Sequence, residues 1–304
     1  MKKILVTGAN GFVGSHLCEM FNNENYNIIG TDFEKRFSND KYEFIESDLL
    51  NDDIESLLSH INPDIIIHCA GSADVHKSVL NPLFDFNGNV VILHRLLFAM
   101  KKLNMENCRF VFLSSAGVYG QPKQLPITEE SPLNPLSPYA LHKKICEDIC
   151  QYFVENYNFN IKIVRIFSTY GPGLRKQIFW DMNEKIKNTG FLKMFGSGNE
   201  SRDYIYITDL INAIYLIAVD DKEKHNIYNV GNAEEVYIKD IAKMFAKEKG
   251  LSQDRIIFDG YVREGDPINW RADISRLEKL GYKKAVNIEN GIKFYVDWIN
   301  SLED

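Results

Sequence analysis

The sequence predicts an α/β fold in which a doubly wound parallel sheet is followed by a smaller C-terminal α/β part. Short apolar, β-rich runs alternate with helical stretches through the first half of the chain. After about residue 170 this alternation loosens, glycine and proline cluster, and a second set of short strands follows. Alternating strands and helices joined by right-handed crossovers produce a parallel sheet. We therefore expect two parts, residues 1–170 and 171–304, with a segment near 205–235 returning to the first part.

The strands expected in the sheet are continuous apolar runs, which is typical of strands covered on both faces. They are Ile4–Val6, Ile28–Gly30, Phe44–Glu46, Ile65–His68, Phe110–Leu113 and Ile161–Ile166. The strands expected in the C-terminal part are Lys193–Phe195, Tyr204–Ile207, Ile227–Val230 and Arg255–Phe258.

Three helices are expected between these strands: one begins near Gly14, one begins near Asn89, and one spans Pro138–Tyr157. In the third helix apolar residues recur every four positions, which predicts a stripe buried in the protein. The stripe consists of Leu141, Ile145, Ile149, Phe153 and Tyr157.

The composition excludes several classes of partner. Of the 304 residues, 45% are hydrophobic and 25% are charged, which is typical of a globular protein. The net charge of −7 gives no broad basic surface, so nucleic acid is not an expected partner. No uninterrupted apolar run approaches the roughly 20 residues that span a bilayer, so no membrane partner is expected. The five cysteines lack paired metal-ligand spacing and predict reduced thiols in a cytoplasmic protein without a metal.

A glycine-rich turn, residues 7–14, follows the first expected strand and opens the first helix. In a dinucleotide-binding Rossmann fold the first glycine makes a tight turn, the second lets backbone N–H groups approach a pyrophosphate, and the third lets the helix pack close to the strand. Gly8, Gly11 and Gly14 have this spacing. The phosphate charge then meets the positive end of the helix dipole. The turn therefore predicts a dinucleotide cofactor.

Asp32 ends the second expected strand, 24 residues after Gly8. An acid at this position accepts hydrogen bonds from the adenosine ribose and repels the 2′-phosphate of NADP. NAD is therefore the favoured cofactor. Lys35 and Arg36 follow closely and can pair with a phosphate, so NADP stays open.

Tyr139 and Lys143 lie one helical turn apart at the start of the third helix, and Ser115 follows the fifth expected strand. The carboxyl ends of such strands face the ligand crevice. A nearby ammonium is expected to lower the pKa of the tyrosine, so that its phenolate can take a proton from a hydroxyl while hydride leaves the same carbon. Ser115 would hydrogen-bond that oxygen and hold it in line. His68, at the end of a buried strand, is interpreted as structural.

Taken together, these motifs resemble the extended short-chain dehydrogenase/reductase family, in the branch that acts on nucleotide-diphosphate sugars and includes UDP-glucose 4-epimerase. The resemblance covers nearly the whole chain. The matching segments are residues 7–14, 48–49, 68–71, 89–90, 114–120, 137–143, 165–172, 196–204 and 263–266. Here Ser168 stands where the family usually has an asparagine that contacts the sugar diphosphate.

The resemblance implies a role for each matched residue. The catalytic residues would be Ser115, Tyr139 and Lys143. The NAD-binding residues would be Gly8, Asn10, Gly11, Phe12, Val13, Gly14, Asp32, Asp48, Leu49, Cys69, Ala70, Gly71, Asn89, Ser114, Tyr139 and Lys143. The substrate-binding residues would be Ser115, Ser168, Arg202, Arg263 and Asp266. Arginine suits this role because its planar guanidinium pairs bidentately with phosphate oxygens.

The residues after the catalytic serine separate the reactions of this family. The resemblance implies an Asp-Glu pair in dehydratases and a glutamate in decarboxylases, whereas this chain has Ala116 and Gly117. Elimination of water is not expected without a second positioned acid or base. The favoured function is NAD-dependent hydride transfer at C4 of a nucleotide-diphosphate sugar, namely epimerisation of a UDP-hexose.

Three alternatives stay open. The first is an NAD(P)H-dependent reductase of a nucleotide 4-keto-6-deoxysugar, which the Ser168 departure supports. The second is a simple sugar-nucleotide dehydrogenase. The third is a non-catalytic dinucleotide-sensing protein on the same fold, which has no need of the Tyr139–Lys143 pair.

The resemblance also implies a homodimer. In the family the long helices of two subunits pair across a two-fold axis into a four-helix bundle. In this chain those helices are the ones near Asn89–Lys101 and Pro138–Tyr157. The expected small-molecule partner is a nucleotide-diphosphate sugar, and polysaccharide biosynthesis is the expected setting.

Overall fold

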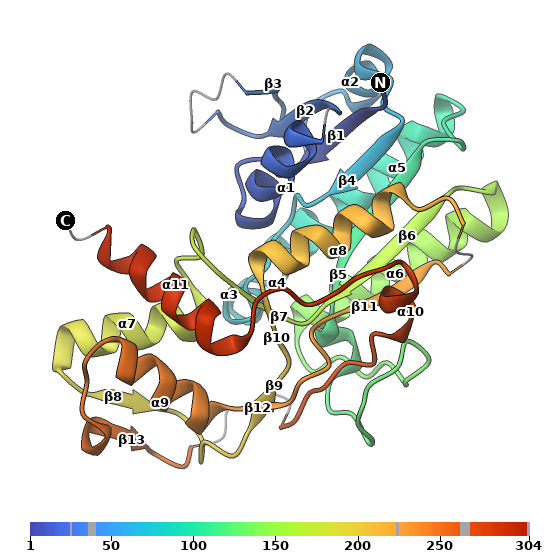
Figure 1. The fold of residues 1–304 in the computed structure, drawn as a ribbon. Helices are drawn as coiled ribbons and strands as arrows, with labels where there is room; N and C mark the ends of the chain where they lie inside the picture. The colour runs from blue at the N-terminus through green and yellow to red at the C-terminus, as the bar shows by residue number, and fades with distance from the viewer. Residues whose placement is uncertain (25, 36–40, 223–224, 262–267, 303–304) are drawn as a thin grey trace.

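The computed structural model describes residues 1–24, 26–35, 41–222, 225–261 and 268–302. Its centre is a seven-stranded sheet in which every pair of neighbours is parallel (Figure 1). The strands follow one another in the order β11 (Ile227–Val230), β6 (Ile161–Ile166), β5 (Arg109–Ser115), β4 (Ile65–His68), β1 (Lys3–Thr7), β2 (Asn27–Asp32) and β3 (Glu43–Glu46). The predicted doubly wound parallel sheet is confirmed. The strand order reverses between β1 and β4, and ligands bind at such a reversal, outside the carboxyl ends of the strands.

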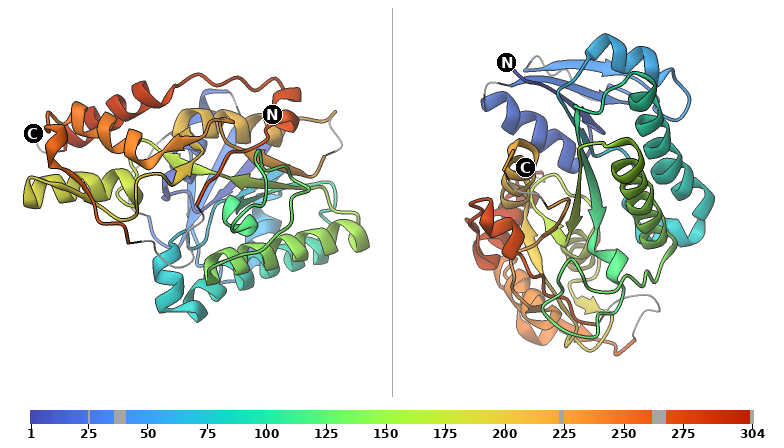
Figure 2. Two further views of the ribbon diagram at one scale, coloured as in Figure 1. Left: turned by 90° about the horizontal axis from the view of Figure 1, so that it is seen from below. Right: turned by 90° about the vertical axis from the view of Figure 1, so that its right-hand side faces the viewer.

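Helices cover both faces of the sheet, as the right-hand view of Figure 2 shows. One face carries α1 (Phe12–Asn23) and α8 (Ile207–Val219), and the other carries α2 (Ile54–Ile61), α5 (Ile92–Lys102) and α6 (Pro138–Tyr157). Alternate residues of a strand point to opposite faces of the sheet. In β1, Ile4 and Val6 belong to the buried cluster on one face, and Leu5 belongs to the cluster on the other. Burial on both faces explains why these strands are continuous apolar runs.

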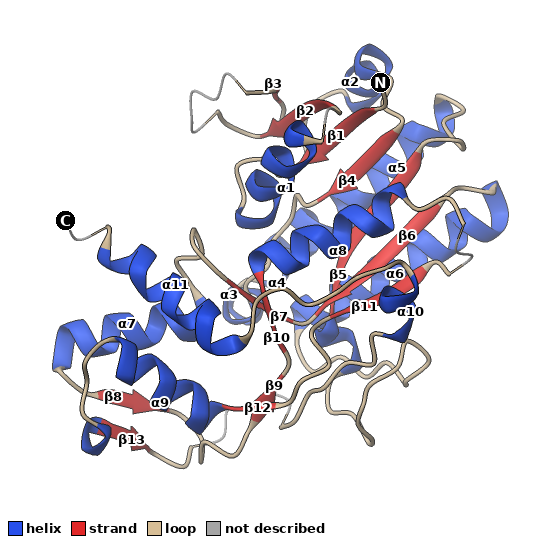
Figure 3. Cartoon of the chain, in the orientation of Figure 1, coloured by secondary structure: helices blue, strands red, loops and turns tan. Residues whose placement is uncertain are grey.

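The C-terminal part has small strand pairs and its own helices, at the lower left of Figure 3. The pairs are β7 (Ser168–Tyr170) with β10 (Tyr204–Tyr206), β9 (Ser201–Arg202) with β12 (Val236–Tyr237), and β8 (Leu192–Met194) with β13 (Ile256–Phe258). The helices are α7 (Gln177–Thr189), α9 (Ile238–Glu248), η3 (Gln253–Arg255) and α11 (Ile288–Asn300). The short helix α10 (Ser275–Lys279) lies instead beside β11 of the large sheet. The expected strand Tyr204–Ile207 ends one residue early, because Ile207 is already the first residue of α8.

The helix expected to begin near Asn89 begins earlier, at Pro82. Short elements α3 (Val75–Leu80) and α4 (Pro82–Phe86) lead through a π-helical segment, η1 (Asn87–Val91), into α5. Proline suits the first turn of a helix because it lacks the N–H that would go unpaired there. By length and composition the continuous stretch Pro82–Lys102 is able to cross a membrane, but 44% of its most apolar window is buried inside the protein. It packs against α2 and α6, as a core helix does.

The stripe predicted on α6 is not the face that the helix buries. Leu141 is 45% exposed, Ile145 and Ile149 are half-buried, and among the five stripe residues Phe153 alone is buried. The buried face lies about a third of a turn away and consists of Ala140, His142, Lys143, Cys146, Glu147, Cys150 and Phe153. The prediction was wrong because this helix has apolar residues on two faces. The face that packs on the sheet is the one that also contains the buried polar side chains His142, Lys143 and Glu147.

A buried polar network fixes α6 to the sheet near the carboxyl ends of β5 and β6. The Glu147 carboxylate accepts the Ser114 hydroxyl at 2.5 Å and pairs with the Arg165 guanidinium at 2.7 Å. Arg165 also donates to the Tyr119 hydroxyl, in the 3-10 helix η2 (Ala116–Tyr119), at 2.8 Å. A buried pair of this kind tolerates little displacement, since breaking it leaves an uncompensated charge.

Gly14→Ala tests the close packing of α1 on β1. A Cβ at Gly14 would collide with the Gly8 carbonyl oxygen, so α1 has to shift. We expect the free energy of unfolding, measured by urea denaturation, to fall by about 1–3 kcal/mol. Gly88→Ala is the control, because a Cβ there meets its nearest atom at 3.8 Å. Equal stability of wild type and Gly14→Ala would contradict the close packing.

Candidate active site

The glycine-rich turn between β1 and α1 is built to approach a ligand closely. Gly8 has a φ of +69°, which is a conformation that favours glycine, and a Cβ there would lie 2.7 Å from the Ala70 nitrogen. The helix begins at Phe12 with Gly11 as its N-cap, and its first turn contains no acidic residue. The N–H groups of that turn have no side-chain cap, and they lie at the positive end of a 12-residue helix, which is the arrangement that favours an anion.

Asp32 reaches this turn from the end of β2. One carboxylate oxygen accepts the Asn10 backbone N–H at 3.0 Å, and the other accepts the Phe33 N–H at 2.9 Å. Each oxygen keeps a further lone pair for a hydroxyl donor. The carboxylate therefore lies where the adenosine ribose of a dinucleotide would bind if its pyrophosphate occupied the glycine turn.

Thr7 connects the carboxyl ends of β1 and β4. Its hydroxyl lies 2.8 Å from Nδ1 of His68 and accepts the Ala70 N–H at 3.2 Å. Burial lowers the pKa of His68 to about 3, with the Lys143 charge as a lesser cause. A ring with so low a pKa is a poor proton acceptor at neutral pH, so His68 supports the loops beside the glycine turn and does not act as a base.

Ser115, Tyr139 and Lys143 meet at the carboxyl end of β5. The Ser115 hydroxyl is hydrogen-bonded to Tyr139 and accepts the Gly117 N–H at 3.1 Å. The Lys143 ammonium donates to the Leu113 carbonyl at 3.0 Å and lies 5.9 Å from the centre of the Tyr139 ring. The structure therefore brings together the three residues for which the sequence predicts catalytic roles.

The electrostatics of Tyr139 differ from the sequence-based expectation. Burial raises the pKa of Tyr139 to about 12, and the hydrogen bond from Ser115 lowers it only in part. The ammonium of Lys143, which was expected to lower that pKa, is directed at the Leu113 carbonyl instead. The pKa of Lys143 is itself lowered, mainly by burial. For Tyr139, desolvation therefore outweighs the hydrogen bond from Ser115.

Other predicted cofactor residues line or support the same edge of the sheet. Asn89 is buried beside Gly71, where a Cβ would lie 2.7 Å from the Asn89 Oδ1 atom. Ser114 turns its hydroxyl to Glu147, and in the sheet it lies opposite Arg165 of β6. Asp48 closes the turn after β3 by accepting the Leu50 N–H at 2.9 Å, and Leu49 is buried in the core. Their contacts with NAD stay predictions.

The strand register leads from the catalytic residues to the predicted substrate residues. Ile166, at the end of β6, pairs with Ser115, and Ser168 begins β7 two residues later. Ser168 in turn lies opposite Tyr204 of β10. Arg202 precedes Tyr204 by two residues, so it lies at the junction of the sheet with the C-terminal part.

Arg202 is held by an aromatic ring and by carbonyl groups. Its guanidinium lies 5.6 Å from the centre of the Trp270 ring, and its Nη1 donates to the Ser201 and Ile268 carbonyls at 2.8 and 3.2 Å. Trp270 in turn donates its indole N–H to the Gly120 carbonyl at 3.0 Å. Stacking on an aromatic face leaves the remaining N–H groups of an arginine free to pair with phosphate oxygens. Arg36, Arg263 and Asp266 lie outside the described residues.

The chain matches a known family over most of its length. The family model described as "NAD dependent epimerase/dehydratase family" matches residues 4–231. The chain belongs to the NAD-dependent epimerase/dehydratase family. The predicted resemblance is thereby confirmed.

Individual members of the family are similar along the whole chain. A Bacillus subtilis relative, "Uncharacterized UDP-glucose epimerase YtcB", is 32% identical over 99% of this chain and 98% of its own length. The UDP-glucuronic acid 4-epimerase of Bacillus cereus, solved with UDP-glucuronic acid and NAD, superposes with a TM-score of 0.87, 31% identity and 99% coverage of both chains. The UDP-glucose 4-epimerase of Thermotoga maritima, solved with UDP-glucose, gives a TM-score of 0.90 at 25% identity, covering 99% of this chain and 100% of the other.

Several supporting residues of this epimerase/dehydratase family site were missed from the sequence. Ser78 accepts the Tyr139 backbone N–H at 3.1 Å, and Asp85 pairs with His142 at 2.6 Å. Trp270 supports Arg202. His142 could have been recognised from the sequence, since it lies between Tyr139 and Lys143 in the first turns of α6. Ser78 and Trp270 could not, since their partners are distant in the sequence.

Asp32→Ala tests the proposed ribose contact. Removal of the carboxylate removes its repulsion of a 2′-phosphate, so we expect the ratio of NADP to NAD affinity to rise about tenfold, equivalent to ~1.4 kcal/mol. Calorimetric titration of the apoprotein with each dinucleotide measures the ratio. Glu19→Ala, which removes a carboxylate that is 60% exposed on α1, is the control and should leave the ratio unchanged. An unchanged ratio in Asp32→Ala would place the adenosine ribose elsewhere.

Proposed function

We propose that this protein is an NAD-dependent epimerase that inverts C4 of a UDP-hexose. The observation that carries the proposal is the convergence of Ser115, Tyr139 and Lys143 at the sheet edge beside the glycine turn. The residues that follow, Ala116 and Gly117, are not ionisable, and Ala116 is fully buried. The site thus contains the groups for proton and hydride transfer at one carbon, without the second acid–base pair that elimination of water needs. The UDP-sugar 4-epimerases among similar structures support the same reaction.

The residues at the switch point fit NAD. The open N-terminus of α1 would hold the pyrophosphate, and Asp32 would hold the adenosine ribose. Lys143 uses one of its three donors on Leu113, which leaves two for the nicotinamide ribose. When bound, NAD supplies the group that accepts a hydride from the sugar and returns it.

Tyr139 would move the proton of the C4 hydroxyl. As the phenolate, its oxygen would take that proton as the C4 hydride leaves. It would return the proton when hydride is delivered to the other face, so protons balance over one cycle. Ser115, already hydrogen-bonded to Tyr139, would hold the sugar oxygen in line.

The diphosphate would bind at the junction with the C-terminal part. Arg202, supported by Trp270, presents a guanidinium there, and Ser168 offers a hydroxyl where relatives usually have an amide. A net charge of −7 gives the diphosphate no general attraction, so such local donors have to provide it.

Identification of the bound dinucleotide and the reaction tests the proposal directly. Denaturation of the purified protein should release NAD, and UDP-hexoses should interconvert at C4 without net consumption of NAD. Stoichiometric oxidation of NADPH by a nucleotide 4-keto-6-deoxysugar, with no interconversion of UDP-hexoses, would overturn the proposal in favour of a reductase.

Tyr139→Phe removes the proton-transfer group and leaves the ring. We expect turnover of the UDP-hexose to fall at least ~100-fold, while the dinucleotide content of the purified protein stays that of wild type. Tyr26→Phe is the matched control, since Tyr26 packs on Phe21 at the opposite end of α1 from the glycine turn. Near-normal turnover in Tyr139→Phe would show that another group moves the proton.

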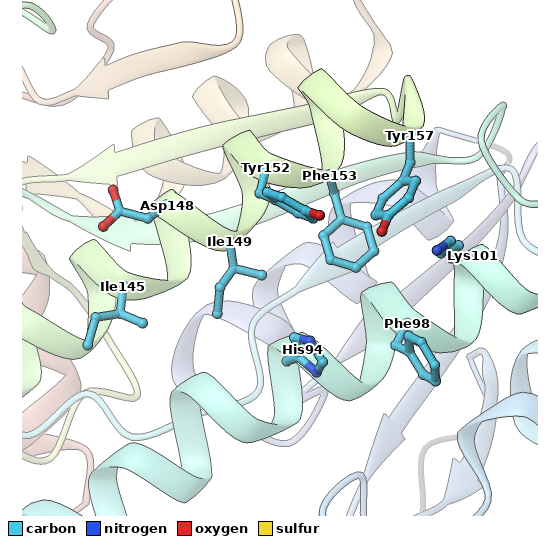
Figure 4. A pocket seen from close by; sticks show the side chains of 9 residues that line it. All are labelled: His94, Phe98, Lys101, Ile145, Asp148, Ile149, Tyr152, Phe153 and Tyr157. Carbon is cyan, nitrogen blue, oxygen red and sulfur yellow. The ribbon is translucent and has the colours of Figure 1, made fainter.

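We also propose that the protein is a homodimer built on α5 and α6. Between these helices lies a groove of about 440 Å³ (Figure 4). It is lined by His94, Phe98, Lys101, Ile145, Asp148, Ile149, Tyr152, Phe153 and Tyr157. The stripe wrongly expected to be buried forms much of this surface, and Leu141 and Phe98 are 45% and 44% exposed. A second copy related by a two-fold axis would cover both helices at once.

Phe98→Asp tests this interface. A charge at the centre of an apolar contact is costly to bury, so we expect the variant to be a folded monomer by light scattering where wild type is a dimer. Phe294→Asp, at a phenylalanine that is 46% exposed on α11, is the control and should stay dimeric. A dimeric Phe98→Asp protein, or a monomeric wild type, would contradict the proposed interface.

We further propose a cytoplasmic location. All five cysteines are free thiols, and four of them are buried. Free thiols are typical of proteins from reducing compartments.

A further inference from the structure

A buried acid–histidine pair lies directly beneath the proposed catalytic residues. Nδ1 of His142 lies 2.6 Å from the Asp85 carboxylate, and the two side chains are only 9% and 1% exposed. The edge of the Phe86 ring covers the imidazole, at 5.3 Å between ring centres. The second carboxylate oxygen of Asp85 is buried and has no hydrogen-bond partner among the described residues. A carboxylate buried in this way is costly unless a cation compensates its charge.

The position of the pair on α6 connects it to the reaction. His142 is three residues after Tyr139 and immediately precedes Lys143, so Asp85 meets α6 between the two. Ser78 of α3 holds the same turn by accepting the Tyr139 backbone N–H. Two side chains from neighbouring helices therefore fix the start of α6, and one of them is charged.

The charge of Asp85 acts on both neighbours. After burial and the Ser115 hydrogen bond, Asp85 is the next influence on Tyr139, and it raises the pKa of the phenol. For Lys143 burial lowers the pKa, and Asp85 is among the groups that oppose this. An unscreened carboxylate at this position would thus oppose formation of the phenolate that the reaction needs.

We infer that His142 is a positioning residue that, as an imidazolium, fixes α6 to Asp85 and cancels the Asp85 charge beneath Tyr139. The inference rests on the proposed function, because it gives the pair a part in the same proton transfer. Without the imidazolium the carboxylate stays in place and raises the barrier to ionisation of Tyr139. With it, the Ser115 hydrogen bond is the main interaction that favours the phenolate.

Among the other titratable groups near the pair, Lys143 is charged, and the Glu147 carboxylate one turn later on α6 is paired with Arg165. The remaining groups carry no competing charge. They are the thiols of Cys69, Cys146 and Cys150 and the imidazole of His68. Burial raises the pKa of each of these thiols and lowers that of His68, so all four are neutral at pH 7. The residue of α3 that is hydrogen-bonded to this turn is Ser78, which is uncharged.

Three variants separate charge compensation from mere packing. His142→Gln keeps an N–H donor for the carboxylate but removes the cation, Asp85→Asn removes the anion, and the double variant removes both charges. His60→Gln, at an exposed histidine of α2, is the control. The measurement is the pH dependence of kcat and KM for interconversion of UDP-hexoses, with urea denaturation of the four variants and wild type.

In His142→Gln we expect the pH of half-maximal kcat to rise by about 1, so that kcat below that pH falls about tenfold, with KM within about twofold of wild type. In the double variant that pH should return to the wild-type value. The urea midpoint should fall in His142→Gln and recover in the double variant, because the uncompensated carboxylate is then gone.

A fall in kcat without a shift of its pH dependence, or a double variant as impaired as His142→Gln, would overturn the inference and leave the proposed function standing. If wild type interconverts no UDP-hexose, the proposed function fails. In that case a double variant with a lower urea midpoint than His142→Gln would overturn the charge pairing as well.

Discussion

Burial of the Lys143 ammonium is the constraint on which the arrangement of the site depends. A cation removed from water needs hydrogen-bond acceptors within the protein. Here the ammonium donates to the Leu113 carbonyl near the end of β5. This bond fixes the position of α6 along β5. Tyr139, one turn earlier on α6, is thereby placed against Ser115, two residues beyond Leu113. A helix shifted by one turn would leave the ammonium unpaired and separate the phenol from the serine.

The polar interior around α6 extends this constraint to the neighbouring strands. Glu147, one turn after Lys143, pairs with Arg165 of β6, and Arg165 reaches the Tyr119 hydroxyl just beyond β5. The face of α6 that the sheet buries is therefore the one with charges that need partners. The apolar stripe of the helix is left outside, where it is available to a second subunit. The same division of polar and apolar faces thus serves both the site and the proposed dimer.

The C-terminal part is joined to the site through a second buried carboxylate. Asp203, next to Arg202, accepts the backbone N–H groups of Asn232 and Ala272 at 2.7 and 3.0 Å. Burial raises the pKa of Asp203 to about 7, and the backbone hydrogen bonds counteract part of that rise. The Asp203 side chain thus connects its own segment with those around Asn232 and Ala272, which are far apart in the sequence. Arg202 is held at the junction because its neighbour is the point where those segments meet.

The sequence by itself determined the doubly wound sheet, the glycine turn, Asp32, and the spacing of Tyr139 and Lys143. These features depend on local patterns, since the period of apolar residues and the conformational needs of a turn can be read from adjacent positions. The tertiary structure alone decided which face of α6 is buried, that Asp85 lies against His142, that Trp270 supports Arg202, and that desolvation dominates the pKa of Tyr139. Each of these features depends on side chains that are distant in the sequence and interact in a buried environment of low polarity. The energies of such interactions leave no periodic pattern of residues that could be recognised in the sequence.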